Sequence, residues 1–158
     1  MSSAANPMNE GIKIRQAVER DADAIRTLTR EAYSKWVPFI GREPLPMSAD
    51  YDKALSSHRF DLFFRGGKLI GLVETIAKRD HLLIENIAVS PAHQGEGVGR
   101  RLLEHAERHA AFLGYSEVKL YTNKAFAENL NYYANRGYRV EREDEFMGGI
   151  CVHMNKCI

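Results

Sequence analysis

Glycines at three alternate positions form the segment of this chain that is best suited to bind a phosphate group. They lie in Gln94-Gly95-Glu96-Gly97-Val98-Gly99, directly before a predicted helix. Glycine lets the backbone adopt unusual dihedral angles and approach a ligand closely. The N-terminus of a helix offers free N–H groups and a partial positive charge, and Arg100 and Arg101 add cationic side chains at the same end. The segment predicts a phosphate site, although a tight strand-to-helix turn with nothing bound explains the glycines equally well.

Two familiar nucleotide-binding motifs do not match this segment. A P-loop has the pattern Gly-x-x-x-x-Gly-Lys-Ser/Thr, whereas two arginines follow Gly99 and no serine or threonine does. In the Gly-x-Gly-x-x-Gly pattern of dinucleotide-binding folds, the third glycine would come one position later. The loop therefore predicts a different kind of anion site.

Two glutamates occur in segments that are otherwise apolar. Glu85 interrupts the run 81–89, and Glu74 lies in the preceding strand-like segment 68–77. A carboxylate in such a run is costly unless it is paired or hydrated, which makes it a candidate for acid–base chemistry. A salt-bridged or edge-exposed glutamate is the alternative for Glu85.

The elements that must position these residues follow from the apolar pattern. Alternation predicts a strand at 12–15, and a helix follows Asp21, its predicted cap. The proline-rich segment 37–47 predicts a loop, and 48–57 predicts a short second helix. The pair Gly66-Gly67 predicts the turn of a hairpin. The remaining predicted elements are hairpin strands 60–65 and 68–77, strand 81–89, helix 98–113, strand 118–121, helix 127–135, and a closing pair 138–142 and 150–155 around Gly148-Gly149. This order predicts an α/β or α+β fold with helices packed on a sheet.

Length and composition predict one soluble domain. The chain has 158 residues and a formal net charge of +1, so composition gives no reason to expect nucleic-acid or membrane partners. We expect residues 1–10 to be a loose tail and 11–158 to be a single domain. Cys151 and Cys157 lie too far apart on one strand to form a disulfide, which favours reduced thiols and a cytoplasmic protein. The histidines lack a metal-ligand spacing with these cysteines, so we expect no metal.

The glycine segment and a later helix together resemble the GNAT superfamily of N-acyltransferases. The central signature of that family is Arg/Gln-x-x-Gly-x-Gly/Ala between a strand and a long helix, and Gln94, Gly97 and Gly99 match it. A second family feature is a helix tyrosine four residues before a glycine–aromatic pair, matched by Tyr133 and Gly137-Tyr138. The motifs have the expected order and separation, and the resemblance extends from position 12 to the C-terminus.

The resemblance implies a fold and a cofactor. The fold would be a mixed, mostly antiparallel sheet of about seven strands flanked by about four helices and splayed at the cofactor-binding strands. Acetyl-CoA would be the co-substrate, its pyrophosphate held by the amides from Gln94 through Arg101. Strand residues Ile87, Ala88 and Val89 would pair with the pantetheine arm, and Asn129 would contact it.

Two side chains are candidates for catalytic roles, Tyr133 by the resemblance and Glu85 by its place in an apolar strand beside the cofactor arm. Tyr133 matches the family's tyrosine and would donate a hydrogen bond to the leaving thiolate, while Tyr132 would be structural. Core packing of both rings is the alternative. Glu85 would be the base for the acceptor amine, with Glu74 as the second choice.

The loop after the first helix is the predicted acceptor side. It resembles that of small bacterial GNAT proteins with an aromatic–Gly-Arg-Glu-Pro segment. Trp36 would form an aromatic floor, and the pocket would use Arg42 for a carboxylate or Glu43 for an amine. A packed connecting loop is the alternative.

The predicted function is transfer of an acetyl group to a primary amine of a small molecule or peptide by direct attack in a ternary complex. A non-catalytic acyl-CoA-binding module and a nucleotide-binding regulatory domain are the alternatives. A homodimer is a further expectation, because edge strands at the C-terminus are often used for pairing between subunits in this fold.

Overall fold

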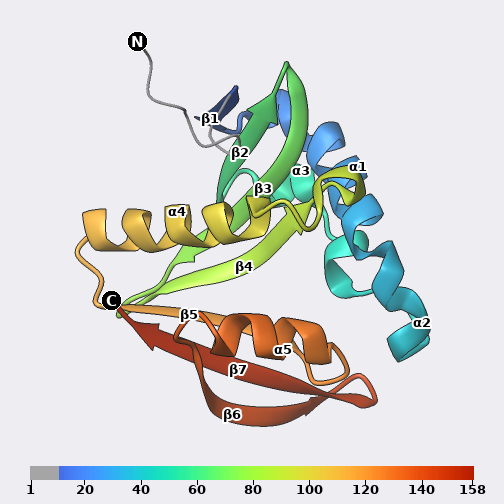
Figure 1. Ribbon diagram of the computed structural model, residues 1–158, viewed down its shortest axis with the longest axis vertical. Coiled ribbons are helices and arrows are strands. Elements are labelled where there is room, and N and C mark those ends of the chain that lie inside the picture. Colours follow the sequence, from blue (N-terminus) through green and yellow to red (C-terminus); the bar gives the residue numbers. More distant parts are fainter. Residues whose placement is uncertain (1–10) are drawn as a thin grey trace.

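Residues 11–158 of the computed structural model form one seven-stranded sheet with helices on both faces (Figure 1). The strand order is β1-β2-β3-β4-β5-β7-β6, and every neighbouring pair is antiparallel except β4 and β5. The strands are β1 Ile12–Gln16, β2 Arg59–Arg65, β3 Lys68–Ala77, β4 Leu82–Val89, β5 Glu117–Asn123, β6 Arg139–Phe146 and β7 Gly149–Cys157. This is the mixed, mostly antiparallel sheet that was predicted. The predicted tail, residues 1–10, lies outside the described residues.

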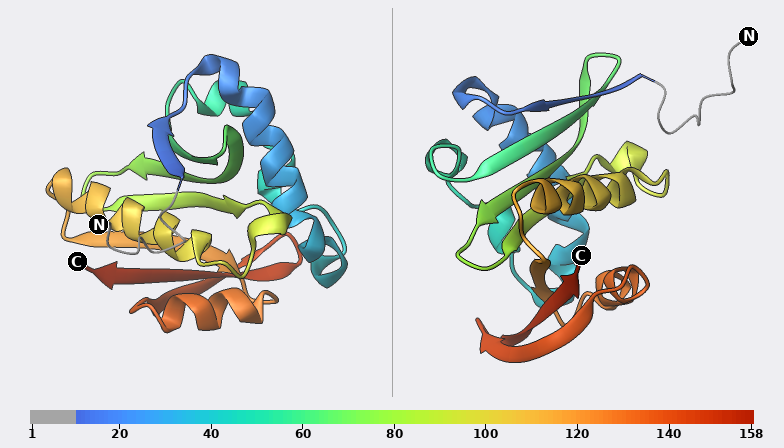
Figure 2. Two further views of the ribbon diagram at one scale, coloured as in Figure 1. Left: turned by 45° about the horizontal axis from the view of Figure 1, so that its top comes forward. Right: turned by 90° about the vertical axis from the view of Figure 1, so that its left-hand side faces the viewer.

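Two layers of helices bury the two faces of the sheet. The helices are α1 Ala22–Tyr33, α2 Val37–Ile40, α3 Tyr51–Ala54, α4 Val98–Phe112 and α5 Ala127–Ala134. Figure 2 shows α4 and α5 on one face, and α1 with α3 on the other. Because side chains alternate along a strand, Leu72 of β3 packs with α1 while Val73 packs with α4.

The two hairpins turn at residues with positive φ, as two-residue turns require. Gly66 and Gly67 have φ of 58° and 79°, which confirms the first predicted turn. The second turn falls at Met147 and Gly148, with φ of 49° and 80°, one residue before the predicted pair. As a result, β6 and β7 pair as far as Phe146 and Gly149 and are longer than predicted.

Three local predictions in the first half of the chain are correct only in part. The segment 37–47 is not only loop: Pro38 lies near the start of α2, where proline is tolerated, and Leu45–Met47 is a 3₁₀ turn. The helix predicted over 48–57 is present as α3, which has only four residues. Asp21 is the N-cap residue of α1, as predicted, but its side chain makes no capping hydrogen bond: the carboxylate accepts from the backbone N–H of Val18 (2.7 Å) and pairs with Arg15.

The parallel pair β4 and β5 separates partway along its length. Leu82–Ile84 pair with Val118–Leu120, and the pairing stops there. Figure 1 shows the two strands diverging beyond this point, which confirms the predicted splay. On its other side β4 has a bulge: Glu74 pairs with Asn86 and Thr75 with Ile84, so Glu85 has no partner of its own. Glu85 therefore has no pairing partner in either neighbouring strand, β3 or β5.

Candidate active site

The glycine loop leads from β4 to α4 with a backbone that suits an anion. Gly95 and Gly97 have φ of 82° and 86°, the left-handed region that glycine adopts without a steric cost. Gly97 is the N-cap of α4, and the first helical bond of that turn joins the Arg101 N–H to its carbonyl (3.2 Å). The preceding N–H groups of Val98, Gly99 and Arg100 have no intrahelical acceptor. They are donors for a ligand at this end of the helix.

Side chains around the loop leave this end of α4 accessible. Val98 is buried in the core and contributes only its backbone, whereas Arg100 is exposed and Arg101 half-buried. A Cβ atom at Gly99 would lie 3.6 Å from the Tyr132 hydroxyl and 3.8 Å from Val89, so the loop passes close to its neighbours. The backbone and the adjacent arginines fit a pyrophosphate.

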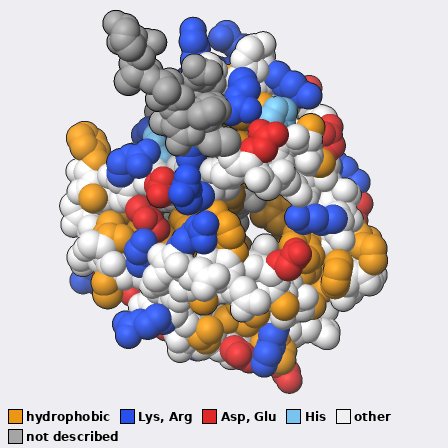
Figure 3. Space-filling model, in the orientation of Figure 1, with side chains coloured by type: hydrophobic (Ala, Val, Ile, Leu, Met, Phe, Trp, Pro, Cys, Tyr) orange, Lys and Arg blue, Asp and Glu red, His pale blue; other side chains and the backbone are white. Residues whose placement is uncertain are grey.

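Other polar side chains of the loop hold it in place. The Gln94 amide donates to the Val89 carbonyl (3.1 Å) and accepts from Lys35 (3.1 Å). Glu96 pairs with Arg65 (3.3 Å). Figure 3 shows the same face as Figure 1 hollowed near its middle, with both basic and acidic side chains around the hollow.

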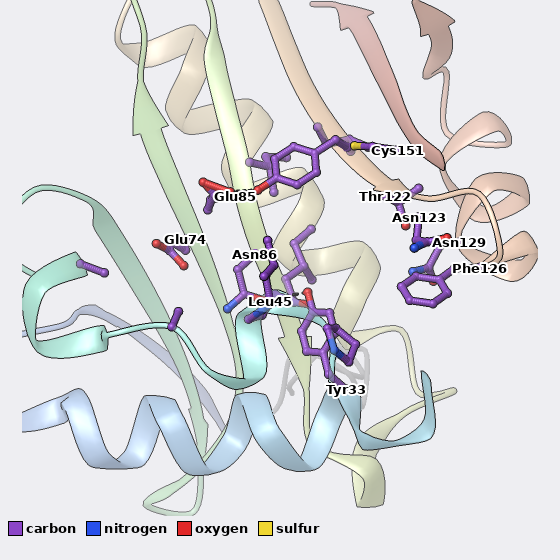
Figure 4. A pocket seen from close by; sticks show the side chains of 18 of the residues that line it. Tyr33, Leu45, Glu74, Glu85, Asn86, Thr122, Asn123, Phe126, Asn129 and Cys151 are labelled. Carbon is purple, nitrogen blue, oxygen red and sulfur yellow. Dashed lines mark hydrogen bonds between the residues drawn. The ribbon is translucent and has the colours of Figure 1, made fainter. Parts of the chain in front are cut away.

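A cavity of about 470 Å³ occupies the space between the separated strands. Its walls come from β3, β4, β5 and β7, from α3 and α5, and from the segment before α3. Figure 4 shows that carboxylate and amide side chains face it from both sides of the gap. The labelled polar residues are Glu74, Glu85 and Asn86 on β3 and β4, and Thr122, Asn123 and Asn129 on β5 and α5.

Glu85 lies at the bulge and lines this cavity. The Tyr121 hydroxyl of β5 donates a hydrogen bond to its carboxylate across the gap between the strands. Burial raises the pKa of Glu85, and the nearby Glu74 carboxylate raises it further. A raised pKa brings a carboxylate closer to the range in which it can exchange protons at neutral pH.

Glu74 is almost fully buried and contacts a histidine that the sequence did not single out. His58 Nδ1 lies 2.6 Å from Glu74 Oε2, and both residues line the cavity. Burial raises the pKa of Glu74, while the hydrogen bond to His58 lowers it. The two residues are 16 positions apart, so only the pairing of β2 with β3 could have indicated that they meet.

Tyr133 and Asn129 of α5 both line the cavity. The Tyr133 ring packs edge-on against Tyr132 and Tyr138, and burial raises the pKa of its phenol. Tyr132 points elsewhere, since Arg136 stacks on its ring (4.0 Å) and its hydroxyl faces the glycine loop. Helix α5 thus presents Tyr133, and not Tyr132, to the cavity.

The structure brings only part of the predicted acceptor set to the cavity. Arg42 lines it. Trp36 is buried and stacks on Phe126 (4.4 Å), and it is Phe126 that lines the cavity. Glu43 pairs with Arg30 (2.8 Å) and does not line the cavity. Trp36 therefore supports the wall from behind.

Within residues 11–158 no group of three or more potential metal ligands occurs. Both cysteines are free thiols, Cys151 half-buried at the cavity and Cys157 exposed. None of the helices in this part of the chain has the length and apolar character needed to cross a membrane.

Comparison with known proteins gives a family and several relatives. The model of the acetyltransferase (GNAT) family matches residues 22–138. N-acetyltransferase family 8 member 3 of Rattus norvegicus is 27% identical over 100 residues, which are 58% of this chain and 44% of that protein. The chain therefore spans less than half the length of this curated relative.

Two solved structures have the same fold. The first is the PaiA N-acetyltransferase of Thermoplasma acidophilum in complex with coenzyme A (TM-score 0.79, 20% identity, 93% of this chain and 99% of that chain). The second is the ribosomal-protein-S18-alanine N-acetyltransferase of Escherichia coli (TM-score 0.76, 19% identity, 93% and 94%). Since the family model covers most of this chain and the fold agrees, the protein belongs to the GNAT acetyltransferase family.

Proposed function

We propose that this protein transfers an acetyl group from acetyl-CoA to a primary amine of a small molecule or peptide, by direct attack in a ternary complex. One observation carries the proposal: the free N–H groups at the start of α4 stand beside the open edge of β4, where pairing with β5 has ended. A pyrophosphate at the helix and an extended arm along the open edge would bring a thioester to the cavity. Membership in the GNAT family and the coenzyme A in the PaiA complex support this cofactor.

The cofactor arm would run along Ile87, Ala88 and Val89. These residues follow the bulge, where β4 no longer pairs with β5. The carbonyls of Ile87 and Val89 accept hydrogen bonds from the side chains of Tyr33 (3.2 Å) and Gln94 (3.1 Å), which the arm would replace or share. Asn129 on α5 lines the other side of the gap and would contact the arm. The strand, the loop from Gln94 to Arg101 and α5 would together hold one extended molecule.

Two side chains would act on the reacting groups. Tyr133 would donate a hydrogen bond to the sulfur as the carbon–sulfur bond breaks. A phenol is a weaker acid than a thiol by about 2 kcal/mol in water, so donating a hydrogen bond is easier for Tyr133 than transferring its proton. Glu85 would attract the acceptor's ammonium group to the bulge and accept its proton there or pass it on. An alkyl ammonium with a pKa near 10.4 costs about 5 kcal/mol to deprotonate at pH 7, so a base matters most for such amines.

The acceptor would enter from the side of the cavity away from the glycine loop. Arg42 and Phe126 line that cavity and would contact the body of the acceptor, with Trp36 supporting Phe126. Glu43 would act only after releasing Arg30. Glu74 lies at the cavity beside His58, and its charge would add to that of Glu85 in attracting an ammonium group.

A thiol-release assay with acetyl-CoA tests the proposal. Polyamines, amino acids, aminoglycosides and short peptides are supplied as acceptors, and free coenzyme A is measured over time. We expect release that depends on one class of amine and a product heavier by one acetyl group. Binding of acetyl-CoA without turnover on any amine would instead support a non-catalytic acyl-CoA-binding module.

A further inference from the structure

The contact between His58 and Glu74 joins a buried carboxylate to a histidine that reaches the acceptor cavity. The Glu74 side chain is 5% exposed and that of His58 is 27% exposed. The backbone N–H of His58 donates to the Ala54 carbonyl (2.7 Å), which fixes the residue at the end of α3. With Nδ1 held by the carboxylate at 2.6 Å, the structure records no partner for Nε2 among residues 11–158. This ring nitrogen is available to a molecule in the cavity.

We propose that His58 is the base that deprotonates the acceptor amine and that Glu74 is the residue that positions it, an assignment that rests on the proposed function. A carboxylate bound to one ring nitrogen of a histidine fixes the tautomer, leaving the other nitrogen as a proton acceptor. The same carboxylate stabilises the imidazolium that forms once the proton has moved. Among the described residues, His58 is the one ion-pair partner of Glu74, whose charge also raises the pKa of the nearby Glu85.

The proton and electron movements balance without a further reagent. The ammonium group gives a proton to Nε2 of neutral His58, and the resulting amine attacks the thioester carbonyl. The carbon–nitrogen bond forms, the carbon–sulfur bond breaks, and the sulfur leaves with the electron pair while Tyr133 donates a hydrogen bond to it. The second amine proton then passes to the sulfur to give the free thiol. His58, being partly exposed, returns the first proton to solvent.

Glu85 is less suited to be the final proton acceptor. Its carboxylate already accepts a hydrogen bond from Tyr121, which holds it at the gap between β4 and β5. It can still attract the ammonium group by charge. The charged or titratable side chains that line the cavity with His58 are Asp50 at the N-cap of α3, Lys53 within it, Glu74, Glu85, Arg42, Cys151, Tyr33, Tyr51, Tyr121 and Tyr133.

Chemical rescue distinguishes a base from a structural histidine. His58→Ala should lower kcat/KM for a basic amine about 100-fold or more, the usual contribution of a general base. Added imidazole should then restore the rate in a concentration-dependent, saturable way, while coenzyme A affinity by calorimetry stays as in wild type. Glu74→Gln should lower kcat/KM about tenfold and shift the acidic limb of its pH profile, because the imidazolium loses a charged partner.

His81→Ala provides the matched control. His81 also bonds to an acidic side chain through Nδ1, that of Asp80 (2.7 Å), but it does not line the cavity. The His81→Ala variant should keep wild-type turnover, and added imidazole should not change its rate. If His58→Ala fails to fold by circular dichroism, His58→Gln replaces it and the pH profile is the readout.

The possible failures are distinguishable. A wild-type protein that releases no thiol with any amine overturns the proposed function and this assignment with it. An active wild-type protein whose His58 variants turn over at the same rate overturns the assignment alone. So does a slow His58→Ala variant that binds coenzyme A normally but does not respond to imidazole, because its loss would then come from packing.

Discussion

Neighbouring tyrosines on α5 have different surroundings, and the roles proposed for them rest on this difference. Tyr133 faces the cavity between β4 and β5, whereas Tyr132 lies under Arg136 and beside the glycine loop. The sequence favours Tyr133 only through its match to the family motif, since two adjacent aromatic residues in a short helix are also expected in a core. The structure adds the orientation that the pattern could not supply.

Tyr133→Phe should slow turnover about tenfold or more while coenzyme A affinity remains unchanged. The variant removes one hydrogen bond to a developing thiolate and leaves the ring packing in place. Steady-state kinetics and calorimetry measure the two quantities. Tyr132→Phe is the control and should keep its rate; an unchanged rate in Tyr133→Phe would make that tyrosine a packing residue.

Asp21 gives a prediction for stability against pH. Arg15 binds its carboxylate through two hydrogen bonds of 2.8 Å and lowers its pKa. A carboxyl group whose pKa is lower in the folded state stabilises the fold above its unfolded pKa, near 3.9, and this stabilisation is lost as the pH falls through the folded value.

Asp21→Asn should therefore lower the free energy of unfolding at pH 7 by about 1–2 kcal/mol, discounted because Arg15 is partly exposed. The difference from wild type should shrink below about pH 4. Urea unfolding at several pH values measures it, with the exposed Asp23→Asn as control. A difference that is independent of pH would show that the ion pair is not its source.

At the scale of elements, the sequence predicted the helices and strands that have a regular apolar pattern or that end at a glycine. The hairpin around Gly66-Gly67, the long helix α4 and the loop before it were found because glycine and apolar periodicity mark them. The short α2 was missed and the helix containing α3 was predicted too long, since four-residue helices carry no period and depend on tertiary contacts. The His58–Glu74 contact was missed because it depends on how β2 and β3 pair.

Gly71 on β3 sets how closely α4 approaches the sheet. A Cβ atom there would lie 3.0 Å from Leu102 and 3.1 Å from Val98, both side chains of α4. Gly71→Val should cost about 1–3 kcal/mol of unfolding free energy and weaken coenzyme A binding, because the start of α4 must shift.

Thermal unfolding measures the stability and calorimetry the coenzyme A affinity. The control is a strand glycine whose Cβ position is not crowded. Gly149 is suitable, since its nearest neighbour is an Asn123 side chain at 3.5 Å, an ordinary contact. Gly149→Val should change both quantities much less. Equal effects of the two substitutions would mean that the packing of α4 on β3 is not what positions the loop.

At the scale of the whole molecule, the sheet consists of two parts whose strands pair over a short length. Between strands β1 to β4 and strands β5 to β7, backbone pairing is confined to Leu82–Ile84 with Val118–Leu120. The proposed cofactor would lie across the opening and contact both parts, through the loop before α4 and through α5. Its binding should therefore stabilise the whole fold.

Acetyl-CoA at about 100 times its Kd should add about 2.7 kcal/mol to the free energy of unfolding, and raise Tm by about 5–10 °C for a chain of this size. Differential scanning calorimetry measures the shift. ATP at the same concentration should give a smaller one, since only the acyl-CoA has an arm for the open strand. A larger shift with ATP would favour a nucleotide-binding domain.

The most direct test of the account is the affinity of coenzyme A for Gly97→Val, compared with Gly114→Val. Both glycines have positive φ, 86° and 90°, at opposite ends of α4, so valine strains the backbone at either position. If main-chain N–H groups at the start of α4 hold the pyrophosphate, titration calorimetry should show at least about a tenfold loss of affinity for Gly97→Val, with Gly114→Val binding as wild type does. Equal affinity in wild type and Gly97→Val would contradict it.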